Sequence, residues 1–124
     1  MNAVHLVGKI ATDIRVQDFT RSDGEIKTKA SFIIAVPRRV KDGPPDWIRI
    51  EAWGGQARNL PRFNRKGSRV AVDGRVRGEF FNRDGGTRGG ELRLVVVAEG
   101  ITYLTPPKTT AEEDPVSAAK AKTR

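Results

Sequence analysis

The segment DWIRIEAW at residues 46–53 decides the fold more than any other stretch of this chain. Its hydrophobicity alternates with a period of two, which is typical of a β-strand. One set of alternating residues is small and aliphatic, as the core face of a sheet requires: Ile48, Ile50 and Ala52. The other set is not plainly polar, because it holds both tryptophans of the protein with an arginine between them: Trp47, Arg49, Glu51 and Trp53.

Two interpretations of this second face are open on the strand alone. Flat aromatic rings spaced along a strand, with a guanidinium between them, suit stacked bases and a phosphate. Alternatively, the tryptophans bury in a second core or in a subunit interface. The rest of the chain has to decide between a binding face and a packing face.

Length and composition bound the class of protein. The chain has 124 residues, enough for one domain with its own core. It has no cysteine, which excludes disulfides, thiolate chemistry and cysteine-ligated zinc. No apolar run approaches the length of a membrane span, and no secretory signal is visible, so we expect a cytoplasmic, nucleoid-associated protein without membrane contact.

The charge balance favours an anionic partner. Lysine and arginine number 23 against 15 acidic residues, a net charge of +8, and arginine outnumbers lysine 15 to 8. A basic surface attracts nucleic acid or an anionic membrane, by steering and by release of condensed counterions. Arginine can also stack on a ring and grip a phosphate with two hydrogen bonds, which lysine cannot do.

Hydrophobic alternation and turn signals predict the order of elements. Strands are expected at residues 2–10 (continuing at 14–19 after a bend), 27–36, 46–53, 69–80 and 91–104, with a helical segment at 56–64. Pro61 lies inside that segment and predicts a short, kinked or broken helix. Gly74 and Gly78 predict a bend or bulge in the fourth strand. Residues 106–124 carry too little apolar surface to fold and are expected to form a disordered tail, so the domain is residues 1–105.

Three strands, a short helix and two further strands are the order of an OB-fold. We therefore expect an all-β protein, a five-stranded Greek-key barrel with one short helix between strands 3 and 4. Strands 2 and 3 of such a barrel form the usual groove for oligonucleotides. The tryptophan-bearing strand is the third one, where that groove would lie.

Ordered motifs over residues 1–105 resemble the bacterial single-stranded DNA-binding protein family. The similar segments are MNAVHLVGKIATDIRV (1–16), KTKASFIIAVPRR (27–39), DWIRIEAWGGQARNL (46–60) and RKGSRVAVDGRVR (65–77). The resemblance implies an OB-fold that assembles as a homotetramer, with a dimer as the alternative. It implies binding of single-stranded DNA without sequence preference, which protects that DNA in replication, repair, recombination or DNA uptake.

The resemblance also assigns roles to residues. It implies that Trp47 and Trp53 stack on bases, that Phe81 or its neighbour Phe80 adds a further stacking ring, and that Arg49 contacts the DNA backbone. Basic residues of two loops and one strand are candidate phosphate contacts: Arg38, Arg39, Lys41, Arg75, Arg77, Arg83 and Arg88. Phe32 and Phe63 are expected in the core, Phe19 either at the groove edge or buried, and His5 at an interface or on the surface.

The chain departs from the family pattern in two places. Val40 stands where a further stacking aromatic is common, which makes contact there more electrostatic. The family's acidic, Phe-ended tail tip has no counterpart, since the chain ends KAKTR (120–124). We therefore expect a secondary paralogue and do not expect recruitment of repair proteins through the tail.

Catalysis and cofactors are not expected. One histidine and no cysteine cannot build a Ser/His/Asp or Cys/His set, no carboxylates have metal-ligand spacing, and no phosphate-binding loop is present. The alternatives to single-stranded DNA binding are a primosome-type accessory protein or RNA-binding module on the same barrel, and a protein–protein adaptor that uses the tryptophans as interface anchors.

Overall fold

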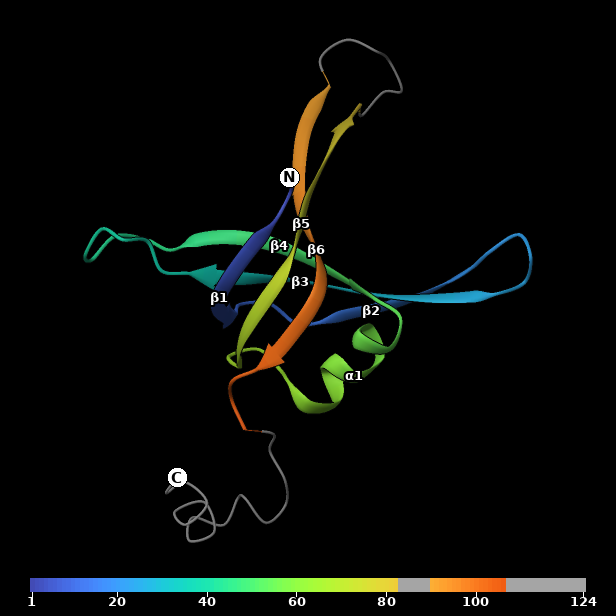
Figure 1. Cartoon of the computed structure of the whole chain (residues 1–124), viewed down its shortest axis with the longest axis horizontal. Coiled ribbons are helices and arrows are strands. Elements are labelled where there is room, and N and C mark those ends of the chain that lie inside the picture. Colours follow the sequence, from blue (N-terminus) through green and yellow to red (C-terminus); the bar gives the residue numbers. More distant parts are fainter. Residues whose placement is uncertain (83–89, 107–124) are drawn as a thin grey trace, which may run out of the picture.

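The computed structural model describes residues 1–82 and 90–106. Figure 1 shows its elements in chain order: β1 (Val4–Ile10), β2 (Arg15–Thr20), β3 (Ile26–Val36), β4 (Asp46–Trp53), α1 (Gly55–Phe63), β5 (Arg69–Phe81) and β6 (Glu91–Tyr103). The predictions that concern Arg83, Arg88 and the tail after residue 106 lie outside the described residues.

The strands form one sheet that closes on itself. The strand order is β1-β5-β6-β4-β3-β2, and β1 also pairs with β3 at Lys9 and Ile10. All pairings are antiparallel except the short parallel contact of β4 with β6. The expected all-β barrel with one short helix is therefore confirmed for the described part of the chain.

The strand count differs from the expectation. The predicted first strand is two strands, because the chain turns between Ile10 and Arg15 and β2 then pairs along β3 instead of continuing β1. The β2–β3 hairpin turns at Gly24, whose φ of 90° suits glycine. The sheet consequently has six strands, and the helix lies between β4 and β5, which are the predicted strands 3 and 4.

Inward residues of the barrel strands and α1 make the core. The fully buried or nearly buried members are Ile10, Ala30, Phe32, Ile34, Ile50, Ala52, Ala57, Leu60, Val70, Val72, Val96 and Ala98. In β3 the inward residues Thr28, Ala30, Phe32 and Ile34 are buried, while Val36 at the end of the strand is only half-buried. The expected core position of Phe32 is also confirmed.

Helix α1 is short and continuous, so of the three expected forms (short, kinked or broken) the structure shows the short one. Pro61 lies in the last turn, and beyond it the Asn64 backbone N–H still donates to the Leu60 carbonyl oxygen at 2.9 Å. Phe63 is not in the core; its side chain is 42% exposed and its ring lies 6.0 Å from that of Tyr103. At about 100° per residue, Phe63 is rotated by about 120° from Ala57, which faces the core.

A bulge confirms the bend expected in the fourth predicted strand. The β5–β6 register shifts between Asp73 and Gly74. At this point the strands approach so closely that a Cβ atom on Gly74 would overlap the Val97 carbonyl oxygen. Beyond the bulge, β5 and β6 continue as a long ribbon that projects from the barrel in Figure 1.

Replacing Gly74 by Ala should destabilise the protein by about 1–3 kcal/mol, because the added methyl group meets rigid backbone. Gly100→Ala, on β6 opposite Asp73, is the matched control, since its Cβ would meet only the Asp73 carboxylate at 4.0 Å. Urea denaturation measures both changes. Equal stability of the two variants would contradict the close packing at Gly74.

Candidate functional site

The outward residues of β4 lie on one continuous face of the sheet. In the β3–β4 register, Trp47 stands opposite Ala35, Arg49 opposite Ile33 and Trp53 opposite Lys29, and directly opposed residues share a face. We call this surface the tryptophan face. It consists of Trp47, Arg49, Glu51 and Trp53 of β4 with their outward neighbours Phe19, Lys27, Lys29, Ile33, Arg75, Arg77 and Arg93.

The two tryptophans differ in their surroundings. Trp47 is 63% exposed and carries its ring open to solvent near the start of β4. Trp53 is half-buried, and its ring centroid lies 6.1 Å from that of Phe19 at an interplanar angle of 39°. The ammonium groups of Lys27 and Lys29 each lie 5.8 Å from the Trp53 ring centroid. Trp53 is therefore held in a cationic aromatic cluster, whereas Trp47 is free to receive another ring.

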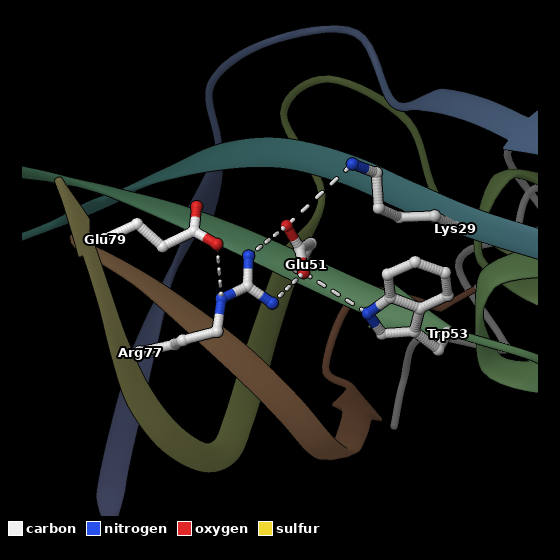
Figure 2. A network of polar contacts seen from close by, with 5 residues as sticks. All are labelled: Lys29, Glu51, Trp53, Arg77 and Glu79. Atoms are coloured by element: carbon white, nitrogen blue, oxygen red, sulfur yellow. Dashed lines mark hydrogen bonds and ion pairs between the residues drawn. The ribbon is translucent and has the colours of Figure 1, made fainter. Parts of the chain in front are cut away.

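Glu51 is buried although it belongs to the outward set of β4 residues. The sequence pattern did not indicate this burial. Its carboxylate accepts two hydrogen bonds from the Arg77 guanidinium, at 3.0 and 3.1 Å. The Trp53 indole N–H donates to the same carboxylate at 3.2 Å, and the Lys29 ammonium lies 3.9 Å away. Figure 2 shows these groups converging on Glu51, with Glu79 on the far side of Arg77 at 3.6 Å.

The predicted basic residues fall into two groups. Three of them already face carboxylates: Arg77 with Glu51, Arg38 with Asp46 at 2.8 Å, and Arg75 with Glu99 at 3.7 Å. Within residues 1–82 and 90–106, three others have no carboxylate oxygen within 4.0 Å: Arg39, Lys41 and Arg49.

Arg49 borders two open hollows of the tryptophan face. One is lined by Ile33, Trp47, Arg49, Arg93 and Leu94. The other is lined by Thr12, Asp13, Arg15, Ser31, Phe32, Ile33 and Arg49. An unpaired guanidinium beside an exposed indole can hold a phosphate while the ring stacks on a base.

Phe80 and Phe81 point to opposite sides of the β5–β6 ribbon, because successive strand residues alternate. Phe81 is on the side of Arg77, and the Arg93 guanidinium lies 4.2 Å from its ring centroid. Phe80 is 75% exposed on the other side, where Leu92 and Leu94 are also exposed. Of the two candidates, Phe81 is thus the one on the side of the tryptophan face.

Sequence reasoning did not single out several cations of this face: Arg15, Lys27, Lys29 and Arg93. The signal was available for Lys27 and Lys29, because alternation around the inward residues Thr28 and Ala30 places them outward beside β4. No local pattern indicated that Arg93 covers Phe81.

Two titratable side chains outside the tryptophan face have notable surroundings, His5 and Tyr103. His5 is exposed and lies 2.7 Å from the Asp73 carboxylate on the neighbouring strand. Burial raises the pKa of the Tyr103 phenol above its ordinary value. In the part of the chain that the structure describes, no three metal-ligating side chains converge, and no helix is long and apolar enough to cross a membrane.

Comparison with known proteins gives consistent matches. The family described as "Single-strand binding protein family" matches residues 1–102. Single-stranded DNA-binding protein 1 of Synechocystis sp. is 33% identical over 90 residues, covering 70% of this chain and 71% of that protein. Single-stranded DNA-binding protein of Clostridium tetani is 34% identical over 107 residues, covering 84% of this chain and 70% of that protein.

A solved structure is also similar. It is the dimeric N-terminal domain of PriB protein from Thermoanaerobacter tencongensis, with a TM-score of 0.56 and 28% sequence identity. The match covers 83% of this chain and 96% of that domain.

The different exposure of the two indoles predicts different fluorescence in the free protein. In Trp53→Phe, the remaining Trp47 should emit at longer wavelength and be quenched strongly by acrylamide. In Trp47→Phe, the remaining Trp53 should be less accessible because Phe19 and Glu51 cover it. Both variants should be quenched alike in denaturing urea. Equal quenching in the folded state would contradict the described geometry.

Proposed function

The chain belongs to the single-strand binding protein family, and from this membership and the tryptophan face we propose that it binds single-stranded DNA without sequence preference. The observation that carries the proposal is the open indole of Trp47 beside the unpaired guanidinium of Arg49. Unpaired bases stack on such a ring, and every base has a π-face, so binding is tolerant of sequence. The protein would thereby protect single-stranded DNA in replication, repair or recombination, a binding role without catalysis.

The energetic terms support tight binding. Each base stacked on an aromatic ring contributes about 1–3 kcal/mol. Trp47, Trp53 and Phe81 are the rings that we propose for this role. Each phosphate neutralised adds a salt-dependent term with a slope of about −0.7 on a single strand. Together, stacking and neutralisation give an affinity that falls as the salt concentration rises. Part of the affinity remains at high salt because stacking on the rings does not depend on neutralised phosphates.

The proposed phosphate contacts follow from which cations are available. Arg49, Arg39 and Lys41 carry no competing carboxylate among the described residues and are the first candidates. Arg38 and Arg75 hold surface ion pairs with side chains about half exposed, and such pairs are worth about 0–1 kcal/mol, so a phosphate can displace the carboxylates. Arg77 is committed to the buried Glu51 and is the least available.

The likeness to the PriB domain is compatible with a primosome-type accessory role. No feature of the tryptophan face favours that role over the one common to the family. The open hollows beside Arg49 also fit a nucleic acid strand better than a protein–protein adaptor, because an unpaired guanidinium there would have to be desolvated against a protein partner.

We further propose that the protein self-associates, as a homotetramer. Phe80, Leu92 and Leu94 are 75%, 55% and 60% exposed on the side of the β5–β6 ribbon away from Phe81. An exposed apolar strip of this kind is typical of an interaction surface. Burying it against other copies would cover Phe80 and Leu92 on the side away from Phe81, while Leu94 also borders the hollow that Trp47 and Arg49 line.

Tryptophan fluorescence tests DNA binding directly. Adding poly(dT) should quench the emission strongly, and the apparent affinity should fall as salt is raised. Trp47→Ala and Phe81→Ala should each weaken binding by about 1–3 kcal/mol, because each removes a stacking ring. The loss should be the same for poly(dT), poly(dA) and poly(dC).

Phe63→Ala is the matched control, since it is the same change at a phenylalanine that is 42% exposed on α1, outside both the tryptophan face and the apolar strip. It should leave DNA affinity per subunit close to that of the wild type. Unchanged emission with poly(dT) at low salt would overturn the proposal. A loss confined to one base would contradict sequence-independent stacking, and parallel titrations with poly(U) compare DNA with RNA.

Light scattering tests self-association. The wild-type protein should show the mass of a tetramer, and Leu94→Glu should lower that mass by placing a charge in the apolar strip. Ile26→Glu, at a residue 61% exposed on the distant β2–β3 hairpin, should leave the mass unchanged. A wild-type monomer at all concentrations, or an unchanged mass for Leu94→Glu, would contradict the proposal.

A further inference from the structure

Glu51 is a carboxylate buried inside a surface that is otherwise cationic. Its side chain is only 9% exposed, whereas the side chain of Glu79, which contacts the same arginine, is 64% exposed. A carboxylate repels phosphates, so its place at the centre of a face built for an anionic polymer needs an explanation. Its contacts supply one.

Each partner of Glu51 is a group that would otherwise serve a nucleic acid. Arg77 gives both terminal nitrogens to the carboxylate at 3.0 and 3.1 Å, which is the fork geometry a phosphate would receive. Lys29 lies 3.9 Å from the second oxygen, on the rim of the Trp53 ring. The Trp53 indole N–H donates at 3.2 Å, which fixes the plane of the ring (Figure 2).

We propose that Glu51 is a positioning and specificity residue, an internal counter-anion that fixes the Trp53 ring and withholds Arg77 and Lys29 from phosphates. This inference rests on the proposed binding of single-stranded DNA at the same face. A ring fixed before binding loses less side-chain freedom when a base stacks on it. The phosphates are then bound by cations that do not contact Glu51, and Arg49 is the first of these.

Withholding charge favours unpaired over paired DNA. Duplex DNA keeps its bases stacked inside the helix, so it meets this face almost only through phosphates. Single-stranded DNA gains stacking on the rings as well. Each cation that Glu51 neutralises therefore removes a larger share of the duplex affinity than of the single-strand affinity, which is specificity obtained by weakening the wrong partner.

Glu51→Gln tests the charge because glutamine has nearly the same shape and keeps an oxygen that can accept from Trp53. Plots of log affinity against log salt should steepen by about 0.7 per released cation on oligo(dT) and by about 0.9 on a duplex of equal length. The ratio of single-strand to duplex affinity should fall several-fold. Circular dichroism confirms that the variant is folded.

Glu79→Gln is the matched control, since it removes one negative charge from the same arginine and leaves the bidentate contact in place. Its slopes and its affinity ratio should stay close to those of the wild type. Equal effects of Glu79→Gln and Glu51→Gln would show that only net charge matters and would overturn the inference.

The double variant Glu51→Gln with Arg77→Gln keeps the inference testable if the single variant does not fold, because the pair is removed together. Arg77 does not contact phosphate in the wild type under this proposal. The salt dependence of oligo(dT) binding, measured as the slope of log affinity against log salt, should therefore be no shallower in the double variant than in the wild type. In Arg49→Ala the same slope should be shallower than in the wild type by about 0.7. A lower slope for the double variant would mean that Arg77 already binds phosphate, which contradicts the proposal.

A measurement without DNA tests the positioning role alone. In the Trp47→Phe background, Glu51→Val removes the acceptor of the indole N–H and should make Trp53 more accessible to acrylamide. Unchanged quenching would show that Glu51 does not position the ring. If wild-type protein fails to bind oligo(dT), the proposed function is wrong, whereas the duplex slopes and this quenching still decide what Glu51 does.

Discussion

The structure depends on the period-two alternation of β4. This strand pairs with β3 along its whole length and with β6 at Ile50 and Glu51, so it lies where the barrel closes. Its inner residues Ile50 and Ala52 are fully buried, which fixes the register. A slip of one residue would exchange the two faces and drive Arg49 and both indoles into the core. The core therefore sets where the rings of the tryptophan face stand.

Alternation and turn chemistry were sufficient to predict much of this arrangement from the sequence. The strand at 27–36, the core position of Phe32, the bulge at Gly74 in β5 and the place of the helix all follow from local rules. The bend after Ile10 was expected, but the segment beyond it was predicted to continue the first strand, whereas it forms a strand of its own, β2. Phe63 was misassigned because, although it is the last residue of α1, it lies about 120° around the helix axis from Ala57, away from the core.

The candidate site shows the same limit at the level of side chains. The alternation of inward and outward residues along β4 predicted that Trp47, Arg49 and Trp53 share one face. The structure adds that the two indole rings have different surroundings. Glu51 reads from the sequence as an ordinary solvent residue. Its main partner is Arg77, which is 26 residues away in sequence and reaches it across β6, the strand between β4 and β5. A partner so distant in sequence leaves no periodic signal along either strand.

The excess of basic residues overstates the positive charge available on the tryptophan face, because several of its basic side chains lie beside carboxylates. A net charge of +8 draws the protein toward any polyanion, including duplex DNA. On the tryptophan face, however, Arg75 and Arg77 face carboxylates, and Lys29 stands beside Glu51. Fewer Lys and Arg side chains are then free to neutralise phosphates and displace counterions from DNA than the composition suggests. Under the proposed function, stacking would consequently carry more of the affinity, and because only unpaired bases offer their flat faces, a preference for a single strand would come from ring geometry more than from charge.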